Sequence, residues 1–317
     1  MAPQVVSLGE ILVEIMRKEK DVPHTVTGVY LGPFPSGAPV IFVDAVSRLG
    51  VSAGFIGKVG KDDFGEMLLN RLKEDNVDVS QIKILEDYTT GIAFNMYFSS
   101  GERRFVFHLR HSAAGQLSPD DIDEEYIARA KVLHVMGSSI AVSKSSMEAV
   151  YKAVEIAYEN NLLISFDPNL RPELLSVEKI REICEPVLSK SKIVLPSGGE
   201  AYTLTGAKEL LEAGKKLLEK GAEIVAIKNG SKGSLIFSED SVLNVPAFKV
   251  EEVDPTGAGD MYDAAFIVGY LKKWPLIKIG EFANAVGAIK VTNFGPMEGP
   301  KNIDEVYNFI KEKKGVV

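Results

Sequence analysis

Apolar residues recur along the chain with two different spacings. Short runs rich in β-branched residues indicate buried strands, and they include 5–9, 53–60, 128–137, 161–169 and 222–230. Segments between them place apolar residues at helical spacing, as at 64–76, 143–161 and 208–221. Strands and helices that alternate in this way predict an α/β fold, with a central, mostly parallel sheet flanked by helices on both faces.

Two segments, at 11–35 and at 88–110, depart from this alternation of strands and helices. They show alternating apolar and polar positions with turn signals instead of helical spacing. The second contains AFNMYF and RRFVFHLR on either side of SSGE, which predicts a hairpin. Strands inserted between helical units suggest a small antiparallel β-sheet that acts as a lid. The chain shows no linker or internal repeat, so we expect a single domain over 1–317 that carries these lid segments.

Three of the predicted strands end in loops of small or polar residues, which read FDPNLRP, LPSGGE and KNGSKG. Ligands of open α/β sheets bind beyond the carboxyl ends of the strands. We therefore expect the three loops to share one rim of the sheet, where a small molecule binds.

The composition narrows the range of partners. The formal net charge is -8, which argues against a nucleic-acid partner but permits a locally positive site. A single cysteine, Cys184, excludes an intramolecular disulfide and favours a reducing compartment, and its helix-like surroundings predict a structural thiol. Neither a signal peptide nor an apolar run long enough for a membrane helix is apparent, so we expect a cytoplasmic protein with no membrane partner.

The stretch DPTGAGD, at 254–260, precedes a predicted apolar helix. One interpretation is structural, because aspartates and glycines are common in helix caps and turns. The other is chemical, because backbone N–H groups of Gly257, Ala258 and Gly259 at a helix start can bind the charge on a phosphoryl group. Asp260 is then placed to accept the proton of an attacking hydroxyl group. The carboxylate and the anion hole would face different atoms of one reaction.

Two further loops suggest a nucleotide site. Glu200 follows a predicted strand and could bind Mg2+. Its place at the start of a predicted helix, where the helix dipole favours a carboxylate, explains it as well. The KNGSKG loop could flank a nucleotide with Lys228, Gly230 and Gly233, and it could also form a hairpin; the two interpretations are compatible. The chain lacks a G-x-x-x-x-G-K-S/T loop and a G-x-G-x-x-G turn after its first strand, which disfavours P-loop enzymes and dinucleotide dehydrogenases.

The substrate side is predicted from three segments. The glycine-containing turn in GPFPSGAP lets the backbone approach a ligand closely, and FDPNLRP supplies polar groups suited to hydroxyls or a carboxylate. A sugar could be reached by the basic residues of the lid hairpin, which are Arg103, Arg104, His108 and Arg110. Turn, cap and solvent-facing roles are the alternatives for these residues. The substrate-binding candidates are Ser36, Gly37, Ala38, Arg104, Arg110, Asp167, Asn169 and Arg171.

On these residues, the chain resembles the ribokinase-like (PfkB) carbohydrate kinases over nearly its whole length. DPTGAGD matches the family's C-terminal signature Asp-Thr-x-Gly-Ala-Gly-Asp apart from Pro255. SGAPVIFVDAVSRLG matches the N-terminal signature, a Gly-Gly turn that leads into a helix ending in Arg-Leu-Gly. The resemblance implies ATP-dependent phosphorylation of a sugar hydroxyl, a Mg2+ requirement, a β-sheet lid and homodimers formed through the lid.

By position, the resemblance assigns roles to individual residues. Asp260 would be the catalytic base, with the backbone of 257–259 as the anion hole. Glu200 matches the glutamate of an Asn-x-x-Glu magnesium motif, in which Ser197 replaces the asparagine that would contact the nucleotide.

The same resemblance suggests where the adenosine and a further cation would bind. Asn284 and the KNGSKG loop would border the adenosine of ATP. The backbone around Asp254, Thr256 and Gly295 corresponds to a monovalent-cation site in some members, so K+ is a candidate cofactor beside Mg2+. Pro255 removes one N–H from this loop, which we expect to be tolerated because the donors that matter follow Thr256.

The resemblance also bears on the substrate. Glu14 falls where many relatives carry an aspartate that binds sugar hydroxyls, and Ile41 falls where most carry a substrate-binding asparagine. FPSGAP with Ile41 two positions after it, together with RRFVFHLRHSA, is most similar to kinases of ketohexoses, so we expect fructose or tagatose as the substrate. Two alternatives stay open. One is a 2-keto-3-deoxygluconate kinase in which Arg171 or a lid arginine binds the carboxylate, and the other is a non-catalytic, sugar-binding regulatory protein on the same fold.

Overall fold

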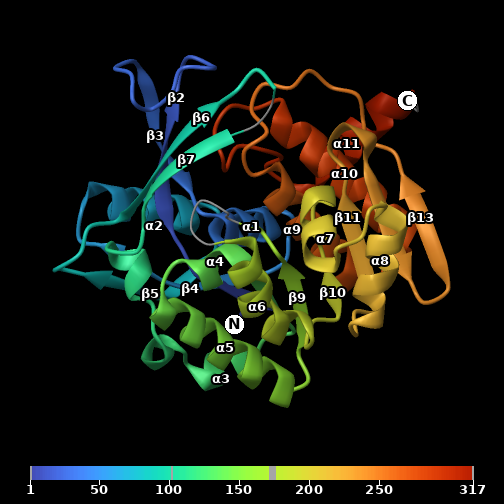
Figure 1. The fold of residues 1–317 in the computed structure, drawn as a ribbon, viewed down its shortest axis with the longest axis horizontal. Helices are drawn as coiled ribbons and strands as arrows, with labels where there is room; N and C mark the ends of the chain where they lie inside the picture. Colours follow the sequence, from blue (N-terminus) through green and yellow to red (C-terminus); the bar gives the residue numbers. More distant parts are fainter. Residues whose placement is uncertain (1, 101–102, 171–175, 316–317) are drawn as a thin grey trace.

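The computed structural model describes residues 2–100, 103–170 and 176–315, and a nine-stranded sheet lies at its centre (Figure 1). Neighbouring strands pair in parallel except at β12, which runs antiparallel to both of its neighbours. The expected mostly parallel sheet is therefore confirmed. In spatial order the strands are β13 (Ser241–Val245), β12 (Ser234–Ser238), β11 (Ile224–Lys228), β10 (Ile193–Val194), β9 (Leu163–Asp167), β8 (Val132–Met136), β1 (Val5–Leu8), β4 (Ala53–Gly60) and β5 (Asp78–Leu85).

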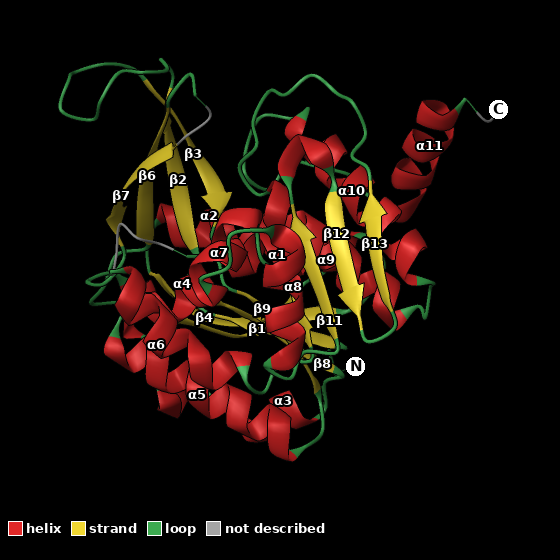
Figure 2. Cartoon of the chain, turned by 45° about the vertical axis from the view of Figure 1, so that its right-hand side comes forward, coloured by secondary structure: helices red, strands yellow, loops and turns green. Residues whose placement is uncertain are grey.

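Helices cover both faces of this sheet (Figure 2). Adjacent residues of a strand point to opposite faces, so Val5 packs into one apolar layer and Val6 into the other. The first layer contains α1 (Ala38–Arg48), α2 (Asp63–Glu74), α9 (Ala258–Leu271), α10 (Leu276–Val291) and α11 (Ile303–Lys314). The second contains α3 (Glu124–Ala128), α4 (Gly137–Ala141), α5 (Lys144–Glu159), α6 (Val177–Leu188), α7 (Gly198–Thr205) and α8 (Leu210–Glu219). Short 3-10 helices lie at Ala113–Gln116, Pro119–Asp121 and Gly230–Lys232.

The single cysteine belongs to the second apolar layer. Cys184 is buried on α6, and burial raises the pKa of its thiol to about 12. Such a thiol stays protonated at neutral pH, which supports a structural role. None of the described helices is long and apolar enough to cross a bilayer.

A second, four-stranded sheet stands apart from the first and forms the expected lid (Figure 1). The two outer pairs are antiparallel, and β6 and β7 form the predicted hairpin, whereas the middle pair of β2 and β6 is parallel. This parallel pair arises because β1 and β5 run in the same direction and continue past their carboxyl ends into β2 and β6. The order is β3 (Tyr30–Ser36), β2 (Leu12–Arg17), β6 (Gly91–Tyr97) and β7 (Arg103–His108).

The central sheet brings the three predicted loops together. β9, β10 and β11 are parallel neighbours, so their carboxyl ends lie side by side. Asp167 ends β9 and Lys228 ends β11, and Lys228 Nζ lies 3.0 Å from Asp167 Oδ2. This contact confirms that the loops share one rim, and residues of this rim and of the lid line one common cavity.

Candidate active site

The first turn of α9 presents open backbone donors to this cavity, called the first cavity below. Gly257 caps the helix with a φ of 83°, a left-handed conformation that favours glycine. A Cβ there would lie 2.2 Å from Pro296 O, so a side chain does not fit. Within the described chain, the N–H groups of Gly257 and Gly259 have no acceptor, whereas that of Ala258 donates to Pro255 O at 3.2 Å. Two of the three expected anion-hole donors are therefore available to a ligand.

The loop before α9 is shaped by the buried carboxylate of Asp254. Its oxygens accept hydrogen bonds from the N–H groups of Thr256 and Gly295, each at 2.9 Å. Tyr97 of lid strand β6 donates its hydroxyl to the same carboxylate at 2.9 Å and also contacts the Thr256 hydroxyl. Pro255 has no N–H to donate, and the loop is held by the residues on either side of it.

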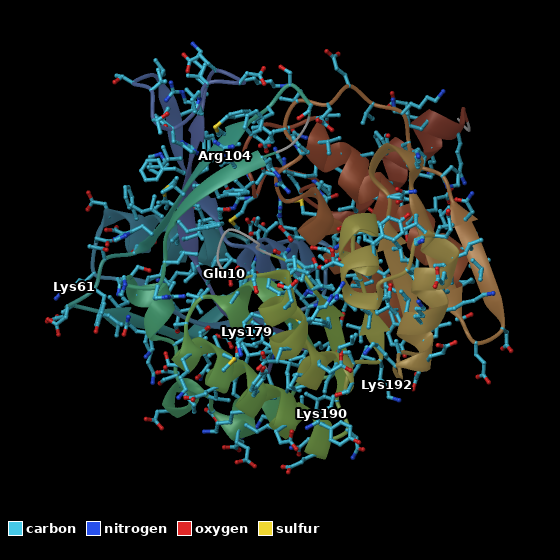
Figure 3. All side chains as sticks on the ribbon, in the orientation of Figure 1. Glu10, Lys61, Arg104, Lys179, Lys190 and Lys192 are labelled. Carbon is cyan, nitrogen blue, oxygen red and sulfur yellow. The ribbon has the colours of Figure 1, made fainter. Side chains whose placement is uncertain are left out.

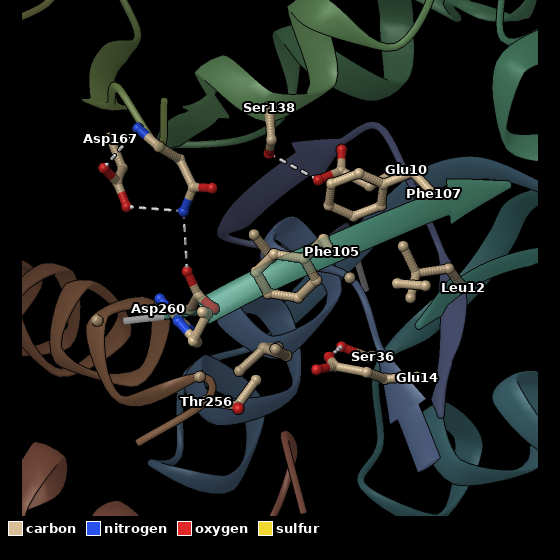
Figure 4. Close-up of a pocket in the computed structure, with 18 of the residues that line it drawn as sticks. Glu10, Leu12, Glu14, Ser36, Phe105, Phe107, Ser138, Asp167, Thr256 and Asp260 are labelled. Atoms are coloured by element: carbon tan, nitrogen blue, oxygen red, sulfur yellow. Dashed lines mark hydrogen bonds between the residues drawn. The ribbon is translucent and has the colours of Figure 1, made fainter. Parts of the chain in front are cut away.

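Asp260 lies in the first turn of α9 and faces the first cavity (Figure 4). Its Oδ1 accepts a hydrogen bond from Asn169 Nδ2 at 3.2 Å. Asn169 is held in turn by Asp167, whose Oδ1 accepts the Asn169 N–H at 3.0 Å. The loop after β9 therefore orients the carboxylate that the sequence predicts to be the base.

A buried ammonium group joins the rim to α9. Lys228 Nζ lies 3.0 Å from Asp167 Oδ2 and 2.9 Å from Asp263 Oδ2. Asp263 stands one helical turn after Asp260 and is fully buried. Burial alone would lower the pKa of Lys228, but the two aspartates raise it above its ordinary value, so the side chain stays charged. A Cβ on Gly259 would lie 3.6 Å from this ammonium, which places the charge close to the anion-hole backbone.

The two aspartates around this ammonium differ in their titration. Burial tends to raise the pKa of Asp167, but Lys228 holds it below its ordinary value. Burial raises the pKa of Asp263 well above its ordinary value. Lys228 therefore offsets negative charge of the two aspartates, which limits the repulsion that a phosphate or the Asp260 carboxylate would meet.

A second cavity of about 550 Å³ adjoins the first. Its lining includes four of the five residues expected to contact a nucleotide, which are Lys228, Gly230, Gly233 and Asn284. The fifth, Ser197, lines the first cavity instead. Asn284 Nδ2 also donates to Val245 O at 3.0 Å and so holds the chain at the end of β13. Both cavities are lined by Lys228, Pro255 and Gly259. The anion-hole backbone therefore lies where the two cavities meet.

Glu200 both caps a helix and faces the first cavity. Its Oε2 accepts the Ser197 N–H at 2.7 Å, and its Oε1 accepts the Leu170 N–H at 2.9 Å. The described residues contain no cluster of three or more side chains that could hold a metal. Mg2+ needs none here, because it is commonly bound by one or two carboxylates together with phosphates and water. Each oxygen of Glu200 retains a lone pair for that purpose, so the residue fits both interpretations.

Two buried glutamates line the first cavity beneath the lid (Figure 4). Glu14 accepts hydrogen bonds from Ser36 Oγ at 2.9 Å and Asn95 Nδ2 at 2.8 Å, and burial raises its pKa above the ordinary value. Glu10, which the sequence did not single out, accepts a hydrogen bond from Ser138 Oγ at 2.6 Å. It follows β1 closely, so its place beyond the carboxyl end of a strand could have indicated it. The same lining includes Ser36, Gly37, Ala38 and Ile41.

The lid contributes alternate residues of β7 to the first cavity. Arg103, Phe105 and Phe107 line it, and the two phenylalanine rings stack with centroids 5.1 Å apart. Arg104 lies on the lid with its guanidinium 5.3 Å from the ring of Phe98 (Figure 3). Side chains alternate between the two faces of a strand, so of the two neighbouring arginines named as possible sugar contacts it is Arg103 that lines the cavity.

Two other expected sugar contacts differ in status. Arg110 is exposed beyond the end of β7 and is not among the described residues that line the first cavity, so its contact with a sugar stays a prediction. Arg171 lies outside the described residues.

Residues 2–302 match the pfkB family of carbohydrate kinases. This chain belongs to that family. Among curated relatives, a probable fructokinase-2 of Arabidopsis thaliana is 34% identical, with 97% of this chain and 95% of that protein covered. A 5-dehydro-2-deoxygluconokinase of Clostridium beijerinckii is 32% identical, with 90% and 85% covered. The family match and the fold together identify a carbohydrate kinase.

Solved structures of the family are similar over the whole chain. An Escherichia coli protein provisionally called ribokinase II, solved with ATP and Mg2+, is 40% identical with a TM-score of 0.91, and the alignment covers 98% of this chain and 99% of that one. A double-mutant fructokinase of Vibrio cholerae, solved with fructose, ADP and a potassium ion, is 26% identical with a TM-score of 0.85 and the same coverage. These neighbours support binding of a nucleotide and a metal by this kinase family.

The turn at Gly257 gives a direct test of the anion hole. We expect Gly257→Ala to lower kcat by about 10²-fold or more, because the clash with Pro296 O must displace at least one of the two open donors. Steady-state kinetics with the best substrate measures the effect. Gly199→Ala is the matched control, since a Cβ in that first helical turn meets no atom within 4 Å. A Gly257→Ala enzyme as active as the control would contradict the role given to this turn.

Proposed function

We propose that this kinase transfers the γ-phosphoryl group of ATP to a hydroxyl of a ketohexose, fructose or tagatose. The observation that carries the proposal is the place of Asp260, which lines the first cavity beside backbone that also lines the second. A sugar in the first cavity and ATP in the second would meet at this point. The fructokinases among the curated relatives support the same substrate class.

In the proposed reaction, Asp260 is the general base. Its carboxylate takes the proton of the attacking hydroxyl while the sugar oxygen forms a bond to the γ-phosphorus, and the bond from that phosphorus to the bridging oxygen breaks to release ADP. Asn169 orients the carboxylate through its hydrogen bond. The N–H groups of Gly257 and Gly259 stabilise the charge on the group in transfer. Mg2+, held by Glu200 with phosphate and water, would neutralise further phosphate charge.

The lining of the first cavity favours a neutral sugar. Glu10 and Glu14 present buried carboxylates that can accept hydrogen bonds from sugar hydroxyls beside their own protein donors. Phe105 and Phe107 add an apolar cover on the lid side, which would exclude water from the reaction. A substrate that carried its own carboxylate would meet repulsion from the two glutamates.

A sugar acid is the second candidate. The 5-dehydro-2-deoxygluconokinases among the relatives are named for such a substrate, and a 2-keto-3-deoxygluconate kinase is the related alternative expected from the sequence. Arg103 supports this candidate, because it brings a guanidinium to the cavity that could pair with a carboxylate. A purely sugar-binding regulatory role is disfavoured, since binding alone does not need Asp260 beside an anion hole.

We further propose that two copies pair through the lid and that the enzyme works in the cytoplasm. Val26, Val29 and Val106 leave 50%, 51% and 51% of their surfaces exposed on or beside the lid strands. β7 is also an edge strand, whose open edge favours pairing with another chain. The single buried cysteine agrees with a reducing compartment. Sedimentation should show a dimer that Val106→Glu dissociates, and a native monomer at all concentrations would contradict the pairing.

The base is tested by Asp260→Asn. We expect kcat to fall by about 10³-fold or more, because the amide cannot take the hydroxyl proton, while ATP binding and the thermal midpoint stay close to native. Coupled kinetics, calorimetric titration with ATP and thermal unfolding measure the three quantities. Asp304→Asn, in the exposed first turn of α11, is the matched control. Turnover within a few-fold of native in Asp260→Asn would rule out this residue as the base.

The substrate class is tested by an ADP-release assay with fructose, tagatose, 2-keto-3-deoxygluconate and 5-dehydro-2-deoxygluconate. We expect the highest kcat/KM with a neutral ketohexose and little change in that value in Arg103→Gln. If a sugar acid gives the higher kcat/KM, and Arg103→Gln removes that preference, the second candidate is correct and the proposal of a ketohexose fails.

A further inference from the structure

A fully buried lysine lies directly behind the loop that leads to the anion hole. Lys290, in the last turn of α10, is 0% exposed. Its Nζ donates to Asp254 O at 2.9 Å and to Asn293 O at 3.0 Å, and Asp254 Oδ2 lies 3.8 Å away. Burial lowers the pKa of Lys290 below its ordinary value, and the nearby Asp254 opposes this shift. Burial of this cation in the core therefore lowers the stability of the fold unless its contacts offset the lost hydration, and these contacts indicate what the residue does.

The contacts of Lys290 join two segments of the site. One is the loop from Asp254 into α9, and the other is the turn at 293–295. The carboxylate of Asp254 bridges the same two segments, because it accepts the N–H groups of Thr256 and Gly295. Three residues after Asp254 comes Gly257, whose N–H is one of the open donors. The ammonium therefore fixes the starting point of the anion hole.

The surroundings of this ammonium are those of a monovalent cation held by oxygen atoms. Two backbone carbonyls and one carboxylate oxygen face it, and no second carboxylate forms an ion pair with it among the described residues. Ammonium and potassium ions carry the same charge and are of similar size, so oxygen atoms that attract one also attract the other. A free K+ beside Asp254 would compete with Lys290 for these oxygens and be repelled by its charge.

We propose that Lys290 supplies from within the chain the positive charge that a free monovalent cation would otherwise supply to this loop, so that the kinase works without K+. The inference rests on the proposed phosphoryl transfer and replaces the K+ site expected around Asp254 and Thr256. Lys290 is a positioning residue, which acts on the reaction through the loop that carries Gly257.

The first test needs only the native enzyme. Its kcat should be the same within about twofold whether choline or K+ is the sole monovalent cation, because the charge is already present. Strong activation of the native enzyme by K+ would overturn the proposal. This experiment remains decisive even if substitutions at Lys290 prevent folding.

Two variants give the second test. Lys290→Ala removes the charge and leaves space, so in choline its kcat should fall by about 10²-fold, and NH4+ or K+ should restore a large part of it. Lys290→Met is the matched control, since it removes the charge but fills the space, and neither ion should restore its activity. Full activity of Lys290→Ala in choline, or a loss that neither ion reverses, would contradict the proposal.

A binding readout separates this inference from the proposed reaction. The thermal midpoint of Lys290→Ala should rise with NH4Cl relative to choline chloride, whereas those of the native enzyme and Lys290→Met should not differ between the salts. This measurement involves no substrate. If the native enzyme phosphorylates no sugar but the midpoint of Lys290→Ala still rises, the proposed function fails and the cation site stands. If activity is present and no midpoint responds, the cation site is wrong.

Discussion

The proposed chemistry of this kinase depends on one constraint: the first turn of α9 must begin with open N–H groups where the two cavities meet. A helix of 14 residues starts there from a left-handed glycine, so its unpaired donors and the positive end of its dipole point to one place. The surrounding contacts preserve that geometry. Asp254 holds the loop before α9 by accepting the N–H groups of Thr256 and Gly295, and Lys228 pairs with Asp263 on the side of the helix.

The same constraint explains how an anion hole tolerates carboxylates nearby. Asp260 stands in the turn itself, but its hydrogen bond from Asn169 ties it to the rim on the side of the first cavity. Lys228 offsets the negative charge of two further aspartates, Asp167 and Asp263, and burial favours the protonated form of Asp263. Phosphate charge and sugar hydroxyls can then be bound by different groups of one small region, as phosphoryl transfer to an alcohol requires.

Much of this architecture could be predicted from the sequence, because its signals are local. Hydrophobic spacing is set by the two periods of secondary structure, and loops after parallel strands must share a rim, so the sheet, the lid hairpin and the place of Asp260 follow. The family resemblance added the roles. Parallel pairing of β2 with β6 was not predicted, because it depends on the direction of strands that are distant in the sequence.

The residues that the sequence missed or left undecided depend on tertiary contacts. In RRFVFH, either set of alternate side chains could face the cavity, so the sequence could not decide whether Arg103 or Arg104 lies there. Asp263 lies one turn after Asp260 in an otherwise apolar helix, which is a signal, but its partner Lys228 comes from another element. Lys290 resembles an ordinary cation at a helix C-terminus until its complete burial is known.

The central claim is that the γ-phosphoryl group is bound by the N-terminus of α9 with the sugar hydroxyl beside Asp260. A crystal structure with a non-hydrolysable ATP analogue, Mg2+ and the best sugar tests it most directly. The account predicts γ-phosphate oxygens within hydrogen-bonding distance of the N–H groups of Gly257 and Gly259, and a sugar hydroxyl between Asp260 and the γ-phosphorus. A γ-phosphate bound away from α9, or a sugar with no hydroxyl near Asp260, would contradict it.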